Sequence, residues 1–245
     1  MKPGPLELPA EPFVFVVATR LDEAGFLRHT RLGRCLPLIS TRGRLPVRAA
    51  FVNSQGLPSV YNRVLDAAKP DEVLVFVHDD VRIDDIWWRL HLGEALQHFD
   101  VIGVAGNQRV PPAHMAWWGG YGPDGTPWRD EAWWSGGVRE EHPGFDGGPV
   151  RDQVHLLGPA PCASRLLDGL LLVARAGVLR EAGVRFDERF DFHFYDLDFC
   201  RSAHAAGLRI GTWPLAVTHS PGGAFGSEAW QQGLVRYRAK WPVDA

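Results

Sequence analysis

The chain has 245 residues, 45% of them hydrophobic and 22% charged, and a formal net charge of −3. This balance is typical of one globular domain with a large core, and it gives no electrostatic basis for binding nucleic acid. Three widely separated cysteines without a CxxC pair argue against a disulfide framework and favour a reducing, cytoplasmic setting. No signal peptide is expected, and no apolar run approaches the roughly 18 residues that a transmembrane segment needs.

The first third of the chain alternates strands with helices. We expect strands at residues 13–17, 47–52 and 72–81, and helices at 22–38 and 58–68. The second helix should end at Lys69, because the residue before a proline disfavours the helical region. A β-α-β-α-β order predicts an α/β fold with a doubly wound, mostly parallel sheet and flanking helices.

The stretch 72–81 begins as an almost uninterrupted apolar strand, which runs directly into His78, Asp79 and Asp80. The carboxyl ends of parallel strands border the crevice where ligands bind in open α/β sheets. His78 and Asp80 lie two residues apart on an extended segment, so they point to the same side, and both can bind Mn²⁺ or Mg²⁺. The alternative is a plain turn in which the aspartates make local hydrogen bonds.

A helix that Asp84 or Asp85 caps should follow, and then a strand at 101–105. Residues 107–158 have no helical period and are rich in glycine, proline and tryptophan, so we expect an irregular loop insertion. Five tryptophans share this segment: Trp117, Trp118, Trp128, Trp133 and Trp134. They form either the loop's own small core or a lid or acceptor surface.

Regular structure should return at residue 168. We expect a strand at 168–174, helices at 175–182, 195–206 and 227–241, and a strand at 208–217. Pro214 should place this last strand at an edge or break it. No linker divides the chain, so residues 1–245 are interpreted as a single domain.

Three further places in the sequence hold candidate site residues. His219 ends a strand and is either a third metal ligand or a hydrogen-bonding residue. Asp196 and Asp198 either complement the dipole of their helix, or one of them is a general base. Asp168 and Gly169 are either a turn or a place where a substrate approaches the backbone.

Several catalytic motifs are missing from the sequence. It has no Walker A motif, no GxGxxG after the first strand, no HExxH and no GxSxG. P-loop ATPases, classical dinucleotide enzymes, zincins and α/β-hydrolases are therefore not expected.

Four segments, in this order, resemble glycosyltransferase family 2, which has the GT-A fold, and within it small proteins similar to the StrF protein of streptomycin gene clusters. They are PSVYNR at 58–63, VFVHDDV at 75–81, DGLLLV at 168–173, and the region from FDE at 186–188 through YDLDFCR at 195–201. The second resembles the family's DXD motif and the last its ED motif. The resemblance spans about residues 13–220.

The resemblance implies a single GT-A-like domain with three parts. Residues 13–105 would be the nucleotide-binding half, 107–158 the lid or acceptor loop, and 159–245 the acceptor and catalytic half. The substrates would be a UDP, GDP or dTDP sugar and a glycan, lipid-linked or small-molecule acceptor, with Mn²⁺ or Mg²⁺ as cofactor.

It also implies roles for individual residues. Asp196 would be the base of an inverting transfer, and Asp80, His78 and His219 would hold the metal. The nucleotide side and the acceptor side would be formed by two further sets, namely Thr19, Arg20, Asn53, Asn62 and Asp79 for the nucleotide, and Asp168, Gly169, Trp117, Trp118 and Tyr195 for the acceptor.

Two positions depart from the family pattern. His78 stands where DXD has its first aspartate, and Tyr195 stands where ED has its glutamate. The alternative function is therefore a non-catalytic nucleotide-sugar or glycan-binding protein with a transferase-like fold. A metal-dependent phosphohydrolase would need more carboxylates around the ion than the sequence places there.

Overall fold

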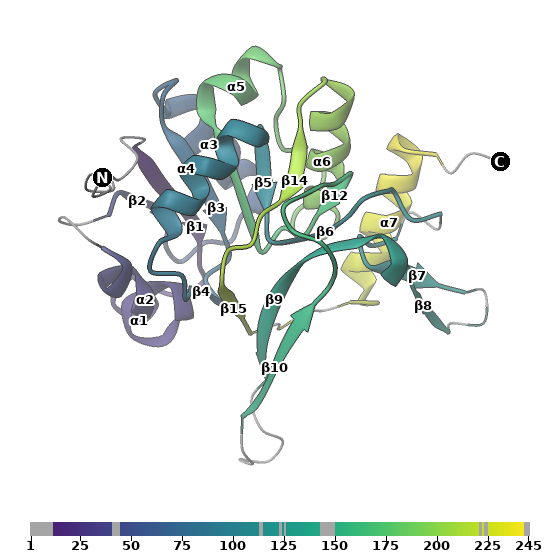
Figure 1. Cartoon of the computed structure of the whole chain (residues 1–245), viewed down its shortest axis with the longest axis horizontal. Coiled ribbons are helices and arrows are strands. Elements are labelled where there is room, and N and C mark those ends of the chain that lie inside the picture. Colours follow the sequence, from purple (N-terminus) through teal and green to yellow (C-terminus); the bar gives the residue numbers. More distant parts are fainter. Residues whose placement is uncertain are drawn as a thin grey trace, which may run out of the picture.

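The computed structural model describes residues 12–40, 45–112, 115–122, 124, 126–142, 150–220, 222 and 225–242. A seven-stranded sheet lies at its centre (Figure 1). Its strands, in spatial order, are β11 (Cys162–Ala163), β14 (Ile210–Thr212), β5 (Val101–Gly103), β13 (Leu171–Arg175), β3 (Val73–Val77), β1 (Phe13–Ala18) and β2 (Val47–Ala50). All except β13 and β11 run in the same direction, so the expected mostly parallel sheet is confirmed.

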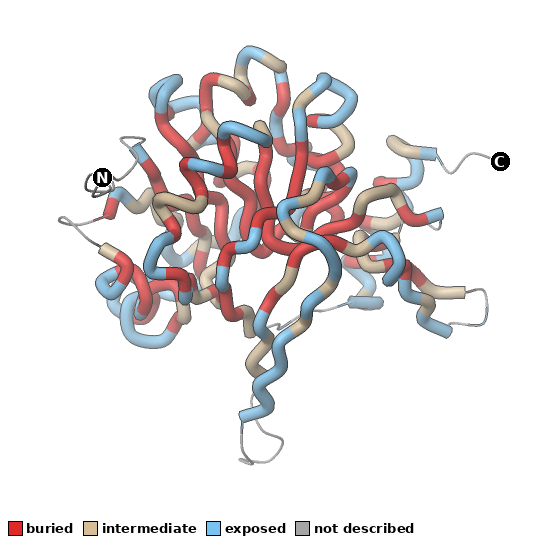
Figure 2. The backbone as a smooth tube through the Cα atoms, viewed as in Figure 1, coloured by how far each residue is buried: buried red, intermediate tan, exposed pale blue. Residues whose placement is uncertain are grey.

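Helices cover both faces of this sheet, as a doubly wound fold requires. They are α1 (Glu23–His29), α2 (Arg31–Ile39), α3 (Leu57–Ala67), α4 (Trp88–His98), α5 (Ala176–Glu181), α6 (Tyr195–Ala205) and α7 (Glu228–Lys240). Alternate residues of β1 enter different cores because side chains alternate across a strand. Val14 and Val16 pack with α3 and α6, whereas Phe13 and Phe15 pack with α2 and α4. The buried residues thus form two cores, one on each face of the sheet, and the chain is most buried in the middle of the molecule (Figure 2).

A second sheet lies across one end of the first. Its strand order is β12 (Leu166–Leu167), β6 (Ala105–Asn107), β9 (Trp134–His142), β15 (Val217–His219) and β4 (Val81–Ile83), and β10 (Arg151–Leu156) also pairs with β9. A separate hairpin joins β7 (Gly119–Tyr121) to β8 (Pro127–Arg129), followed by the 3₁₀ turn η1 (Glu131–Trp133). The β9–β10 hairpin projects from the body (Figure 1).

The second sheet and the separate hairpin correct the expectation of an irregular segment at 107–158. Strands β7, β8, β9 and β10 all lie within residues 107–158. No hydrophobic alternation marks β9 and β10 in the sequence, because most of their residues are at least partly exposed, as in a two-stranded ribbon.

Several element boundaries also differ from expectation. The helix predicted at 22–38 divides at Thr30, whose hydroxyl donates to the carbonyl of Phe26 and accepts from the N–H of Gly33. The strand predicted at 101–105 divides at Val104 into β5 and β6. Neither Asp84 nor Asp85 is the N-cap of α4, which is Trp87, although Asp85 accepts a hydrogen bond from the Trp87 N–H. The predicted break at Pro214 is confirmed, since β14 ends before it and β15 begins after it.

Candidate active site

The end of β3 is where the site residues converge. Beyond Val77, the His78 N–H donates to the carbonyl of Leu170, just before β13, at 3.1 Å. A turn through Asp79 and Asp80 then leads into β4. Strand β15 pairs antiparallel with β4 and places His219 opposite Val81. The fold thus brings residues 78, 80 and 219 together from two segments that are far apart in the sequence.

His78, Asp80 and His219 form the one group of potential metal ligands found among the described residues. One ligand atom from each lies within 4.8 Å of those of the other two. His219 Nε2 is 3.5 Å from Asp80 Oδ2, whereas Asp80 Oδ1 is buried without a hydrogen-bond partner in the described chain. Two imidazoles and a carboxylate with an unsatisfied oxygen fit a divalent cation such as Mn²⁺.

The electrostatics of this trio keep a negative charge on Asp80. Burial opposes that charge, but the hydrogen bond and charge of His219 outweigh burial and hold the pKa of Asp80 below its ordinary value. The pKa of His219 is raised in turn, because Asp80 outweighs the effect of burial on the imidazole. Burial lowers the pKa of His78.

Asp196 lies in the first turn of α6, half-buried, and points toward the same site. Its Oδ2 accepts from the N–H of Gly169 at 3.0 Å, and its Oδ1 from the N–H of Leu197 at 2.9 Å. Burial, and then the nearby carboxylate of Asp168, raises its pKa to about 7. Asp198, on another face of the helix, is fully buried and faces Lys240 and Trp241 instead.

Asp168 and Trp117 are tied to each other. Trp117 Nε1 donates to Asp168 Oδ2 at 2.9 Å, and the N–H of Leu170 donates to Asp168 Oδ1 at 2.9 Å. The second bond closes the turn between β12 and β13. Asp168 therefore holds the tryptophan-rich segment against the end of the central sheet.

Tyr195 connects His78 with the turn that contains Gly169. Its hydroxyl donates to the carbonyl of Gly169 at 2.8 Å and lies 2.8 Å from Nε2 of His78. Gly169 has no room for a side chain, because a Cβ there would lie 2.3 Å from the Tyr195 oxygen and 2.9 Å from Cβ of Asp196. The close approach expected at Gly169 is thus made by the protein's own side chains.

One cleft of about 430 Å³ collects these groups. Nine of the predicted site residues line it, namely His78, Asp80, Trp117, Trp118, Asp168, Gly169, Tyr195, Asp196 and His219. The metal-capable trio, the carboxylate of Asp196 and two tryptophans of the 107–158 segment therefore face a common space. Trp133 does not line it and is 42% exposed.

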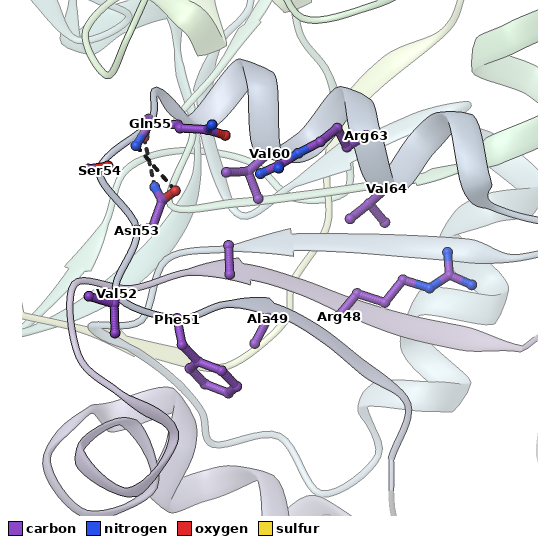
Figure 3. Close-up of a pocket in the computed structure, with 11 residues that line it drawn as sticks. Arg48, Ala49, Phe51, Val52, Asn53, Ser54, Gln55, Val60, Arg63 and Val64 are labelled. Carbon is purple, nitrogen blue, oxygen red and sulfur yellow. Dashed lines mark hydrogen bonds between the residues drawn. The ribbon is translucent and has the colours of Figure 1, made fainter.

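Three of the predicted nucleotide-side residues are connected to one another at the ends of β1, β2 and β3. The N–H of Asn53 donates to the carbonyl of Thr19 at 2.8 Å, and the Thr19 hydroxyl is hydrogen-bonded to Asp79. Burial raises the pKa of Asp79. Asn53 also lines a separate pocket of about 500 Å³ between β2 and α3, where its amide closes a turn with Gln55 (Figure 3).

Arg20 and Asn62 do not share this arrangement. Arg20 is exposed at the end of β1. Asn62 is buried on α3, where its amide accepts from the N–H of Phe186 and donates to that residue's carbonyl and to Glu188. Neither residue is among those that line the two cavities.

Sequence reasoning missed several residues of the cleft, namely Glu140, Phe192, Phe225 and Trp230. The Phe192 ring stacks on His78 with 5.6 Å between ring centroids. The cluster of aromatic residues at 190–195 is a signal in the sequence for Phe192, whereas Trp230 lies within a predicted helix and carries no signal of a site. Glu140 carried no signal, because β9 was not predicted.

Comparison with known proteins shows likeness in structure only. No protein-family model matches the sequence, and no curated protein sequence matches it. Three solved structures match as follows. GalNAc-T7 with UDP, GalNAc and Mn²⁺ has a TM-score of 0.52 and 13% identity, over 94% of this chain and 48% of that one. S. aureus TarS 1–349 in complex with UDP has a TM-score of 0.52 and 13% identity, over 93% and 64%. The mannosyltransferase PcManGT from Pyrobaculum calidifontis, with GDP-Man and Mn²⁺, has a TM-score of 0.50 and 14% identity, over 100% and 68%.

These likenesses agree with the architecture described above. The chain spans between about half and two thirds of the length of the three structures. Among the described residues, no helix combines the length and the apolar character needed to cross a membrane. At 13–14% identity the matches establish the fold alone, and by that measure the chain has a GT-A glycosyltransferase fold.

Proposed function

We propose that the chain is a metal-dependent, inverting glycosyltransferase that moves a sugar from a nucleoside-diphosphate sugar to an acceptor. The observation that carries this proposal is that Asp196, whose pKa is about 7, and the trio His78, Asp80 and His219 line one cleft. Placement in the StrF-like branch of family 2 rests on the sequence motifs and belongs to the proposal.

The donor would lie with its diphosphate beside Asp80 and His219. Mn²⁺ or Mg²⁺ bound by the trio would supply positive charge where the diphosphate leaves. The nucleotide would extend toward Thr19, Asn53 and Asp79, with Arg20 and Asn62 as more distant contributors. The structures of similar fold that hold UDP or GDP-Man support a uracil or guanine base, whereas thymine rests on the family resemblance of the sequence motifs.

The acceptor would enter from the side of Asp168, Trp117 and Trp118. Asp196 would take the proton of the acceptor hydroxyl as its oxygen bonds to the anomeric carbon and the bond from that carbon to the diphosphate breaks. A carboxylate with a pKa of about 7 is well matched to this role at neutral pH, because it is ionised enough to act and basic enough to accept the proton. The tryptophan indoles would help to exclude water from the donor.

The test is transfer from a panel of UDP, GDP and dTDP sugars with Mn²⁺, with the anomeric configuration of any product read by NMR. We expect transfer with inversion in the wild type, and losses of about 10²–10⁴-fold in Asp196→Asn. Full activity in both Asp80→Asn and Asp196→Asn would refute the proposal. Nucleotide-sugar binding without turnover would instead favour the non-catalytic alternative.

A further inference from the structure

The two positions at which the sequence departs from the family pattern touch each other. His78 Nε2 and the Tyr195 hydroxyl are 2.8 Å apart, although the residues are 117 positions apart in the chain. Tyr195 is fully enclosed, with 2% of its surface exposed. The residues at the two departures therefore form one hydrogen-bonded pair, in which Tyr195 can act on the imidazole of His78.

The direction of this hydrogen bond follows from the other partner of Tyr195. A phenol has one proton to donate, and the carbonyl of Gly169, 2.8 Å away, can only accept it. Toward His78 the phenol oxygen must then accept, so the proton between them belongs to Nε2. In a neutral imidazole whose Nε2 carries the proton, Nδ1 has the free lone pair.

We propose that Tyr195 is a positioning residue that holds His78 in the Nε2–H tautomer and so presents its Nδ1 lone pair to a divalent ion shared with Asp80 and His219. The inference rests on the metal site of the proposed function. A ligating histidine usually donates its second N–H to an oxygen that fixes its tautomer and orientation, and here that oxygen comes from a tyrosine. Phe192, stacked on the same imidazole, restrains the plane of the ring.

Gly169 connects the pair formed by His78 and Tyr195 with the carboxylate of Asp196. Its carbonyl orients Tyr195, and its N–H orients Asp196. A single peptide segment between β12 and β13 thus sets both the ligand tautomer and the position of the carboxylate. A Cβ at this position would lie 2.3 Å from the phenol oxygen and would disturb both.

The experiment compares wild type, Tyr195→Phe and the control Tyr237→Phe. The control removes the hydroxyl of another buried tyrosine, on α7, which does not line the cleft. Histidine ¹⁵N spectra of the metal-free protein give the tautomer, with the His78 signal assigned from its absence in His78→Gln. Titration with Mn²⁺ alone, by calorimetry, gives the affinity of each protein.

In the wild type we expect His78 to carry its proton on Nε2, in a signal protected from exchange with water. In Tyr195→Phe that protection should be lost and Mn²⁺ affinity should fall about 10- to 100-fold, whereas Tyr237→Phe should keep both. Wild-type His78 protonated on Nδ1, or wild-type Mn²⁺ affinity in Tyr195→Phe, would overturn the inference. The wild-type spectrum decides the tautomer even if Tyr195→Phe does not fold.

The same data separate this inference from the proposed function. Absence of Mn²⁺ binding by the wild type would refute the metal site and, with it, the part of the inference that concerns the ion. Tight Mn²⁺ binding that does not depend on Tyr195 would leave the proposed function standing and refute the inference alone.

Discussion

The carboxylate of Asp196, on α6, accepts a hydrogen bond at 3.0 Å from the backbone N–H of Gly169, which lies in the turn that joins β12 to β13. This bond and the one from Leu197 stabilise the charged form, yet burial and Asp168 outweigh them and raise the pKa of Asp196 to about 7. The result is a carboxyl group that titrates at neutral pH. Both its reactivity and its effect on stability should therefore change near pH 7.

The first prediction concerns the pH dependence of transfer. Because the base must be ionised, kcat/KM should rise tenfold per pH unit below about pH 7 and level off above it. The measurement is a pH profile of transfer at saturating Mn²⁺. In Asp196→Asn the residual rate should lose this limb, whereas a limb unchanged in the variant would assign the titration to another group.

The second prediction concerns stability without metal. Asp196 keeps its proton in the folded state up to about pH 7, while in the unfolded chain it ionises near its ordinary value of 3.8. Its contribution is therefore fully present below pH 3.8 and is lost as pH rises toward 7. Relative to the wild type, the free energy of unfolding of Asp196→Asn should therefore rise by up to about 4 kcal/mol between pH 4 and pH 8, the linkage energy of a shift of about three pKa units.

Denaturant titrations at several pH values measure this difference. The change of this difference with pH is the informative quantity. The asparagine side chain must place its NH₂ group against the N–H of either Gly169 or Leu197, which adds a cost that does not depend on pH. Asp71→Asn, at an exposed carboxylate, is the matched control and should change stability by less than about 0.5 kcal/mol at any pH. A difference between Asp196→Asn and wild type that is constant with pH would contradict the raised pKa.

The third prediction concerns Gly169→Ala. The new methyl group would lie 2.3 Å from the Tyr195 oxygen, so the tyrosine must move and the protein should lose about 1–3 kcal/mol of stability. Mn²⁺ affinity should fall as well, since His78 loses its partner. Gly222→Ala is a fitting control, because Gly222 lines the same cleft and a Cβ there meets nothing within 4 Å. Equal melting temperatures for the two variants would show that the Tyr195 side chain can shift to accommodate the new methyl group without loss of stability.

The central sheet could be predicted from the sequence because its strands β1 and β3 are buried on both faces and are nearly unbroken apolar runs. The direction of β13 could not be predicted, since an apolar run looks the same in a parallel and an antiparallel strand. The β9–β10 ribbon could not be predicted either, because no hydrophobic alternation marks it. The wall of the cleft that includes Glu140 belongs to this ribbon, so it could not be predicted.

The site was predictable as a set of residues and not as a set of contacts. Two kinds of signal in the sequence, polar residues at the ends of strands and the family motifs, predicted a site with His78, Asp80, His219 and Asp196. These four residues do line one cleft. The bond between His78 and Tyr195 could not be foreseen, because it depends on β13 lying against β3 and on the conformation before α6. Phe194 there adopts a left-handed backbone with φ of 68°, held by packing on Trp230 and Tyr237.

The fourth prediction concerns which ion the site prefers. Imidazole suits borderline transition metals better than Mg²⁺, which favours oxygen ligands and an octahedral water shell. With two histidines and one carboxylate, the protein should bind Mn²⁺ and Co²⁺ at least tenfold more tightly than Mg²⁺. Shifts in melting temperature with each ion, without nucleotide, measure the difference. His219→Ala should abolish the Mn²⁺ shift, and an equal response to Mg²⁺ would argue that the imidazoles are not ligands.

The last prediction concerns the attachment of α7 beside the site. Asp198 of α6 is fully buried, and Lys240 lies 2.7 Å from its Oδ1, to which the indole of Trp241 also donates at 2.8 Å. Removing the cation in Lys240→Met would leave a buried carboxylate without its counter-charge, so we expect a loss of about 3 kcal/mol of stability in denaturant titration. Arg129→Met is the control, because its pair with Glu131 is exposed and 3.9 Å long and should contribute less than about 0.5 kcal/mol. Because Trp230 of the same helix lines the cleft, Lys240→Met should also weaken transfer, and a variant that loses stability with unchanged kcat and KM would show that α7 supports the fold without shaping the site.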